Sequence, residues 1–175
     1  MVSKSLIAVT AALVLAGCVG TEEVEAVDTT GSDTFGNWTV TSASDPETGN
    51  NLLFANAFSE IGSDEAILWV GLLCDDTELE VGFGLVAPFQ PSEPLIITTQ
   101  IEGGPVMDRQ GDVFEGDEAV AGFASNDVAL AFLSELTTGL ALTATIDNAG
   151  EILGPAQFDI TGADLVAQRI DDECL

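Results

Sequence analysis

Apolar residues in the first half of the chain come in short groups that are separated by turn-forming residues. Residues 37–43 and 52–58 predict two strands, and the turn-forming residues 45–50 lie between them. The continuous apolar run over 66–74 predicts a strand that is buried on both faces, and 95–101 predicts a further strand. This spacing is typical of a sheet built from short strands.

A strict alternation of apolar and other residues follows the run over 66–74. Its apolar members are Leu79, Val81, Phe83 and Leu85, and they alternate with Glu78, Glu80, Gly82 and Gly84. Successive side chains of a strand point to opposite faces of its sheet, so a period of two separates two faces. The segment therefore predicts a strand with one dry face and one wet face.

Two helices are predicted in the second half from apolar residues that recur every three or four positions. The first carries Val128, Phe132, Leu133 and Leu136 on one face. Ser125 or Asn126 is expected to cap its start, and Gly139 to end it. The second is expected to start with a capping box of Thr161 and Asp164.

The face of the second helix carries Ala163, Val166, Ile170 and Cys174, which predicts that Cys174 points into the core. Alternating residues over 140–146 and 156–160 predict a pair of strands between the helices. The fold class is therefore predicted to be α+β, an antiparallel β-sheet packed against two helices, with both helices on one side.

The first residues resemble a bacterial lipoprotein signal. Lys4 precedes an apolar run of about a dozen residues, whereas a membrane-spanning helix needs about 20. The run ends in Leu15-Ala16-Gly17-Cys18, which looks like a lipobox. We predict that residues 1–17 are a signal peptide and that the sulfur of Cys18 is lipidated. Val19 follows the cysteine in place of an aspartate, which favours the outer membrane, facing the periplasm.

The next residues are predicted to link this anchor to one globular domain. Residues 18–34 are rich in Thr, Glu, Asp and Gly, which predicts a lipidated cysteine followed by a flexible acidic tether. Residues 35–175 contain the periodic segments and are predicted to form a single α+β domain.

The charge balance is strongly acidic and excludes some partners. Arg109 and Arg169 are the cations that remain after residue 17, against thirty acidic residues, which gives a formal charge of −28. Nucleic acid is a poor partner, since it is bound by clustered cations. Two explanations stay open for the acids: adaptation of the surface to high salt, and binding of a cation or a basic partner.

Cys74 and Cys174 form an even pair in a domain that is predicted to be exported. Such a pair indicates a disulfide. A free nucleophilic thiol at Cys74 is the alternative, although the chain contains no histidine to act as its base.

Several segments of the domain together form a recognisable frame. They are Trp38-Thr39-Val40, Leu72-Leu73-Cys74, residues 78–81, residues 102–105, the pattern Ala129-x-x-Phe132-Leu133-x-x-Leu136, and residues 158–162. This frame resembles a family of small exported bacterial proteins, which includes an accessory lipoprotein found with some type VI secretion systems. It covers most of residues 35–175 and implies a disulfide-tied domain with an accessory role in the envelope. The sequence departs from the family where an arginine is expected before the Gly-Gly-Pro turn, since Gln100 and Ile101 stand there.

The residue types exclude several kinds of chemistry. Without histidine there is no Ser-His-Asp triad and no histidine metal site, and no lysine remains after residue 17 for Schiff-base or P-loop chemistry. No cofactor is predicted.

Carboxylates are the candidate chemistry that remains. Glu78 and Glu80 lie two apart on one strand face, a spacing that a glycosidase pair could use. Two acidic groups are weak candidates for a hard cation, although the chain lacks an EF-hand loop. They are Asp75, Asp76 and Glu78, and Asp112, Glu115, Asp117 and Glu118. A solvated acidic surface is the favoured explanation of both groups, because chance clusters are expected among so many acidic residues.

The remaining cations and tryptophans are assigned structural roles. Arg169 is expected to form a salt bridge at the helix end, and Arg109, taken to lie in a loop, to form a surface pair. Trp38 and Trp69 are expected in the core. The sequence thus favours a non-catalytic envelope lipoprotein that binds another envelope component. The alternative is a divalent-cation-binding or carboxylate-dependent hydrolytic module.

Overall fold

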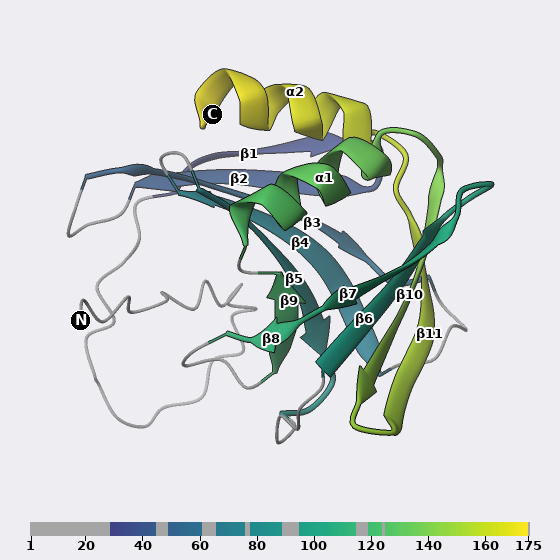
Figure 1. The fold of residues 1–175 in the computed structure, drawn as a ribbon. Coiled ribbons are helices and arrows are strands. Elements are labelled where there is room, and N and C mark those ends of the chain that lie inside the picture. The colour runs from purple at the N-terminus through teal and green to yellow at the C-terminus, as the bar shows by residue number, and fades with distance from the viewer. Residues whose placement is uncertain are drawn as a thin grey trace, which may run out of the picture.

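The computed structural model describes residues 29–44, 49–60, 66–75, 78–88, 95–114, 119–123 and 125–174. These residues form two antiparallel sheets and two helices (Figure 1). The predicted α+β class, with antiparallel strands packed against two helices, is therefore confirmed, and the strands are divided between two sheets.

The larger sheet contains the strands of the first half of the domain. In spatial order its strands are β1 (Thr29–Phe35), β2 (Trp38–Ser44), β3 (Asn51–Phe58), β4 (Ile67–Asp75), β5 (Glu78–Leu85), β9 (Val120–Phe123) and β8 (Asp112–Val113). The first five follow one another in the chain as a meander. Short connections between neighbouring strands allow this arrangement.

The smaller sheet brings together segments that are distant in the sequence. Its order is β11 (Glu151–Asp159), β10 (Ala141–Asn148), β6 (Leu95–Ile101) and β7 (Val106–Gln110). Strand β10 pairs with β6 on one side and with β11 on the other, all antiparallel. The chain therefore leaves the larger sheet after β5 and returns to it for β8 and β9.

Both helices lie against the larger sheet on the side of the core (Figure 1). Helix α1 (Asn126–Leu136) contacts β5 and β9, whereas α2 (Ala163–Glu173) contacts β1, β2 and β3. Strand β11 of the smaller sheet contacts β3 and β4. One face of the larger sheet is thus covered jointly by α1, α2 and the smaller sheet, and their buried side chains form one core cluster.

Trp38 connects the start of the domain to its end. Its side chain is fully buried, and its Nε1 donates a hydrogen bond to the carbonyl of Ile160 over 3.2 Å. This agrees with the prediction that Trp38 belongs to the core. The bond satisfies a buried polar group and fixes the segment that leads into α2.

The predicted boundary between tether and domain is wrong. Residues 29–34 were assigned to the tether, but they form most of β1, which pairs with β2 through a hairpin at Gly36-Asn37. An edge strand can be held by backbone hydrogen bonds to one neighbour, so its sequence needs no hydrophobic pattern. The earlier part of the tether, 18–28, lies outside the described residues.

Three short strands were not predicted for a similar reason. Strand β7 has mostly exposed side chains, and β8 and β9 contain two and four residues. Such strands are too short or too polar for an alternation to stand out.

The predicted helix caps form differently from the expectation. Ser125 occupies the N-cap of α1 without a side-chain cap hydrogen bond, and the Oδ1 of Asn126 accepts from the backbone N–H of Leu79 over 2.9 Å. The capping box of Thr161 and Asp164 is absent, because Gly162 is the N-cap of α2. Its φ is +94°, and a Cβ there would lie 2.3 Å from the carbonyl oxygen of Phe35, so tertiary contact excludes a side chain.

Candidate functional site

The larger sheet has a second face, opposite the helices, and aromatic side chains gather on it. Phe58 pairs with Trp69 and Phe54 with Leu73 across β3 and β4. Alternate residues of these strands, such as Ala55 and Leu72, are fully buried in the core. By the strand period, Phe54, Phe58 and Trp69 lie together on the other face, and we call these three residues the aromatic face.

The indole of Trp69 packs on the backbone of glycine residues in β4 and β5. A Cβ at Gly84 would stand 2.0 Å from the indole Cε2 and Nε1, and one at Gly71 would stand 2.8 Å from Cζ3. The ring therefore occupies space that side chains at these positions would fill. Phe54 meets the indole edge-on, with ring centroids 5.9 Å apart and an interplanar angle of 85°.

The aromatic face is open to solvent to different degrees. Phe58 is 64% exposed, while Phe54 and Trp69 are partly buried. The prediction that Trp69 is a core residue is therefore wrong. The run over 66–74 is apolar on both faces, so its pattern could not distinguish the core face from the outer one. The feature of the sequence that could have indicated this placement is the group of glycines in β4 and β5 on which the indole packs.

The wet face predicted for the strand that begins at Glu78 is only partly confirmed. Glu78 is exposed and Glu80 is partly buried, but Gly82 and Gly84 are buried. Gly84 pairs with Trp69, so the indole removes this part of the strand from solvent.

Acidic side chains continue the same face beyond the aromatic residues. Asp75 pairs with Glu78 across β4 and β5, and Leu73 pairs with Glu80. The structure thus brings together two of the three weak metal candidates, while Asp76 lies outside the described residues. Within the described ranges, no three His, Cys, Asp or Glu side chains are placed to hold a metal ion.

The other acidic candidates are not brought to a site that can be described. Asp112 is exposed on β8, and Glu115, Asp117 and Glu118 lie outside the described residues. The proposed glycosidase pair, Glu78 and Glu80, lies two apart on one face of β5, as the alternation predicts.

The predicted disulfide is confirmed. Cys74 of β4 is bonded to Cys174 at the end of α2, with a Cα–Cα distance of 6.2 Å. Both cysteines are buried. Cys18, the predicted lipidation site, lies outside the described residues.

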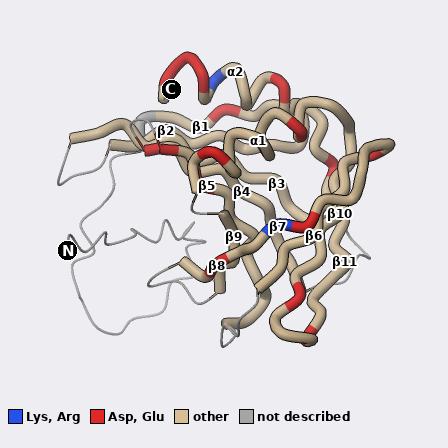
Figure 2. Tube along the Cα trace, in the orientation of Figure 1, with Lys and Arg blue, Asp and Glu red and all other residues tan. Residues whose placement is uncertain are grey.

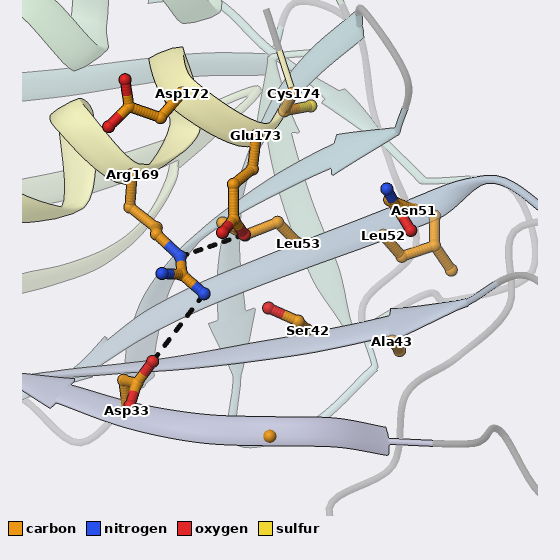
Figure 3. A pocket seen from close by; sticks show the side chains of 11 residues that line it. Asp33, Ser42, Ala43, Asn51, Leu52, Leu53, Arg169, Asp172, Glu173 and Cys174 are labelled. Carbon is orange, nitrogen blue, oxygen red and sulfur yellow. Dashed lines mark ion pairs between the residues drawn. The ribbon is translucent and has the colours of Figure 1, made fainter.

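A groove lies beside this disulfide, between α2 and the strands β1 to β3 (Figure 3). It has a volume of about 660 Å³, and Arg169 extends into it from α2. The Nε of Arg169 is 3.0 Å from Glu173 Oε2, and its Nη2 is 3.8 Å from Asp33 Oδ2. The expected salt bridge at the helix end is confirmed. With Asp172 also in its lining, the groove holds three carboxylates and one guanidinium, so it disfavours anions.

Arg109 occupies a different place from the one predicted. It lies on β7, not in a loop, and its side chain is only 10% exposed. Its Nη1 donates to Thr99 Oγ1 over 2.8 Å, and its Nη2 donates to Glu135 on α1. The guanidinium carbon is 5.7 and 5.6 Å from the ring centroids of Phe123 and Phe132. This arginine therefore joins β7, β9 and α1, and it does not form a surface pair.

Comparison of the chain with protein-family models, with characterised proteins and with solved structures gave no match. The candidate site therefore rests on its own geometry. Neither helix of the described part has the length and hydropathy of a membrane-spanning segment.

Charge is distributed over the whole domain. Figure 2 shows acidic positions on both helices and on strands of both sheets, whereas the two arginine positions lie on α2 and β7. Both arginines are paired with acids in the structure. Acidic positions thus occur on both helices and both sheets, and Asp75, Glu78 and Glu80 lie on the same sheet face as the aromatic face.

Proposed function

We propose that this chain is a non-catalytic lipoprotein of the bacterial cell envelope, whose domain binds another envelope component through the aromatic face. The lipobox ending at Cys18 supports anchoring by lipid, and Val19 in place of an aspartate after it supports the outer membrane, facing the periplasm, in a Gram-negative cell. The resemblance to small exported disulfide-tied proteins supports an accessory role.

The observation that carries the proposal is the exposure of Phe58 next to the partly buried Trp69 and Phe54, on a sheet whose opposite face already supplies the core. Aromatic residues are enriched at protein interfaces, where they bury large areas at low cost in conformational entropy. Phe58 is 64% exposed and pairs with Trp69 on the face of the sheet opposite the core. A partner that covers both would remove apolar area from water.

A photo-crosslinking experiment in intact envelopes tests this function. A photoreactive amino acid replaces Phe58 in the full lipidated chain, and the matched control carries it at Ile152, which is 63% exposed on the smaller sheet. We expect one envelope component to be captured in high yield from position 58 and not from position 152. Capture from both positions, or from neither, would contradict a binding role for the aromatic face.

The anchor is tested in the same cells. The Cys18→Ser variant is expected to leave the membrane fraction and to lose its crosslink. A variant that stays in the membrane would contradict anchoring through this cysteine.

A further inference from the structure

We propose that the aromatic face receives a basic polypeptide segment, one that carries arginine or lysine together with apolar side chains. This inference rests on the proposed function and adds the chemistry of the partner. It follows from the charge of the domain, the quadrupole of the aromatic rings and the order of aromatic and acidic positions along one sheet face.

The net charge of the chain favours a partner that carries positive charge. The chain has a formal charge of −27, and the two arginines of the described part are paired with Glu135 and Glu173. A surface of this kind repels anionic lipid headgroups, anionic glycans and nucleic acid, and it speeds the approach of cations. The electrostatic field of the domain therefore favours a basic polypeptide segment over a neutral or an acidic one.

The aromatic face supplies local attraction for the same partner. The face of a tryptophan ring carries partial negative charge and attracts guanidinium and ammonium groups. The backbone of Gly84 and Gly71 supports the indole of Trp69 from below, and Phe54 holds it edge-on. The ring is thus fixed before a ligand arrives, which reduces the entropy lost on binding.

The acids set the direction in which the segment lies. Trp69 and Asp75 are at opposite ends of the outer face of β4, and Glu78 and Glu80 lie beside that end on β5. Six residues of a strand span about 20 Å. An extended segment of about six residues would therefore reach from the rings to the acids, with apolar and cationic side chains at Trp69 and Phe58 and cations at the acidic end.

The tryptophans provide a direct readout of binding. The chain has two tryptophans, so the indole N–H groups give two NMR signals. Trp38 is fully buried, with its Nε1 bonded to Ile160, and serves as an internal reference. The mature lipidated chain in nonionic detergent micelles is titrated with a peptide of about eight residues that alternates arginine and valine. The comparison probes are the same peptide with glutamate for arginine, and cellohexaose.

We expect the arginine peptide to move the Trp69 signal saturably and to leave that of Trp38 in place. The affinity should fall by about tenfold between 50 and 200 mM salt, because salt screens the charge pairs between the peptide and the acidic end of the face. The glutamate peptide should cause no shift. A shift with cellohexaose but not with the arginine peptide would overturn the basic segment in favour of a glycan, and no shift with any probe would also overturn it.

Two pairs of variants separate the site from general attraction to a negative surface. A Cβ at Gly84 clashes with the indole, so Gly84→Ala should weaken the arginine peptide at least about fivefold, while Gly31→Ala, with nothing within 4 Å, should not. Glu80→Gln should weaken it at least about threefold, whereas Asp164→Asn, an exposed acid on α2, should have little effect. Equal affinity in all four variants would overturn the inference.

The crosslink at position 58 distinguishes failure of this inference from failure of the proposed function. A partner that is captured there through a segment without arginine or lysine contradicts the basic segment and leaves the binding role intact. Capture of nothing contradicts both.

Discussion

The two arginines of this chain both form ion pairs, but they differ in how far their side chains are exposed to solvent. The guanidinium of Arg109 lies over the adjacent rings of Phe123 and Phe132 and is bonded to Glu135, and its side chain is 10% exposed. Arg169 lies in an open groove with its side chain 35% exposed. Water reaches both members of the second pair but mainly the carboxylate of the first, since the Arg109 side chain is buried, so the same chemical group should contribute different free energies.

This contrast is testable at the residue scale. Arg109→Met leaves Glu135 without its partner, and we expect it to lower the free energy of unfolding by about 2–4 kcal/mol, discounted because Glu135 is 33% exposed. Arg169→Met, the matched control, should cost less than about 1 kcal/mol. Urea unfolding at fixed salt measures both.

A double variant that lacks both partners of this ion pair tests the same interaction in a double-mutant cycle. Since it removes both charges, Arg109→Met with Glu135→Met should recover more than half of the stability lost by Arg109→Met alone. Equal losses for the two single arginine variants would contradict the buried role of Arg109.

At the scale of elements, α2 is attached to the sheet at both of its ends. The disulfide of Cys74 and Cys174 holds its C-terminal end, and the segment before Ala163 is held by contacts with the β1–β2 hairpin. There Asn37 N–H donates to the Thr161 carbonyl, and Trp38 donates to Ile160. Local helix propensity alone is weak for eleven residues, so these attachments stabilise α2.

Removal of the disulfide should therefore release one end of α2. The bond closes a sequence separation of 100 residues, which corresponds to about 4–5 kcal/mol in the chain-entropy model. We expect the Cys74→Ala and Cys174→Ala double variant to lose stability of this order. Amide hydrogen exchange should rise first in residues 163–173. Uniform exchange across the domain would contradict local attachment of the helix.

The other attachment should depend on pH. The side chain and backbone N–H of Thr161 donate to Asp159, and this lowers the pKa of that carboxyl below its ordinary value of 3.8, with a smaller contribution from Asn37. Because the pKa is lowered on folding, the stabilisation is present above pH 3.8 and is lost as the pH falls through the lowered value.

Asp159→Asn should remove this dependence. The difference in unfolding free energy between the native chain and this variant should stay constant from about pH 7 to about pH 5 and shrink towards about pH 3. Asp164→Asn reports the general effect of deleting one negative charge. A difference that does not change with pH would contradict the assigned hydrogen bonds.

In the molecule as a whole, repulsion among the negative charges of the surface opposes the stabilisation that burial of the core supplies. One cluster of buried side chains joins both sheets and both helices, while the chain carries a charge of −27. Repulsion among like charges destabilises the compact state, and added salt reduces it by shortening the screening length from about 30 Å at 0.01 M to about 3 Å at 1 M.

The melting temperature should therefore rise with sodium chloride, by at least about 5 °C between these concentrations, which is roughly 1–2 kcal/mol for a domain of this size. A melting temperature that is flat in salt would contradict adaptation of the surface to salt. Calcium titration at fixed high salt is the matched test of the alternative, because only a cation site predicts a further saturable shift.

The amino-acid sequence by itself determined the features that depend on local pattern. The alternation at Leu79, Val81 and Phe83 placed these residues in the core, and the periodic residues of 126–136 and 163–173 gave both helices. The even pair of cysteines was sufficient for the disulfide. These features could be predicted because side-chain direction repeats with the period of the backbone.

Only the tertiary structure decided features that depend on contacts between distant segments. Residues 29–34, predicted as tether, form a strand because they pair with β2, and Arg109 is buried because it packs over the rings of Phe123 and Phe132 and pairs with Glu135. The apolar run over 66–74 has no period that separates two faces, so its pattern could not place Trp69. The indole lies on the outer face because the glycines of β5 leave room for its ring. The candidate binding face therefore arises from packing between strands, which a local hydrophobic pattern does not encode.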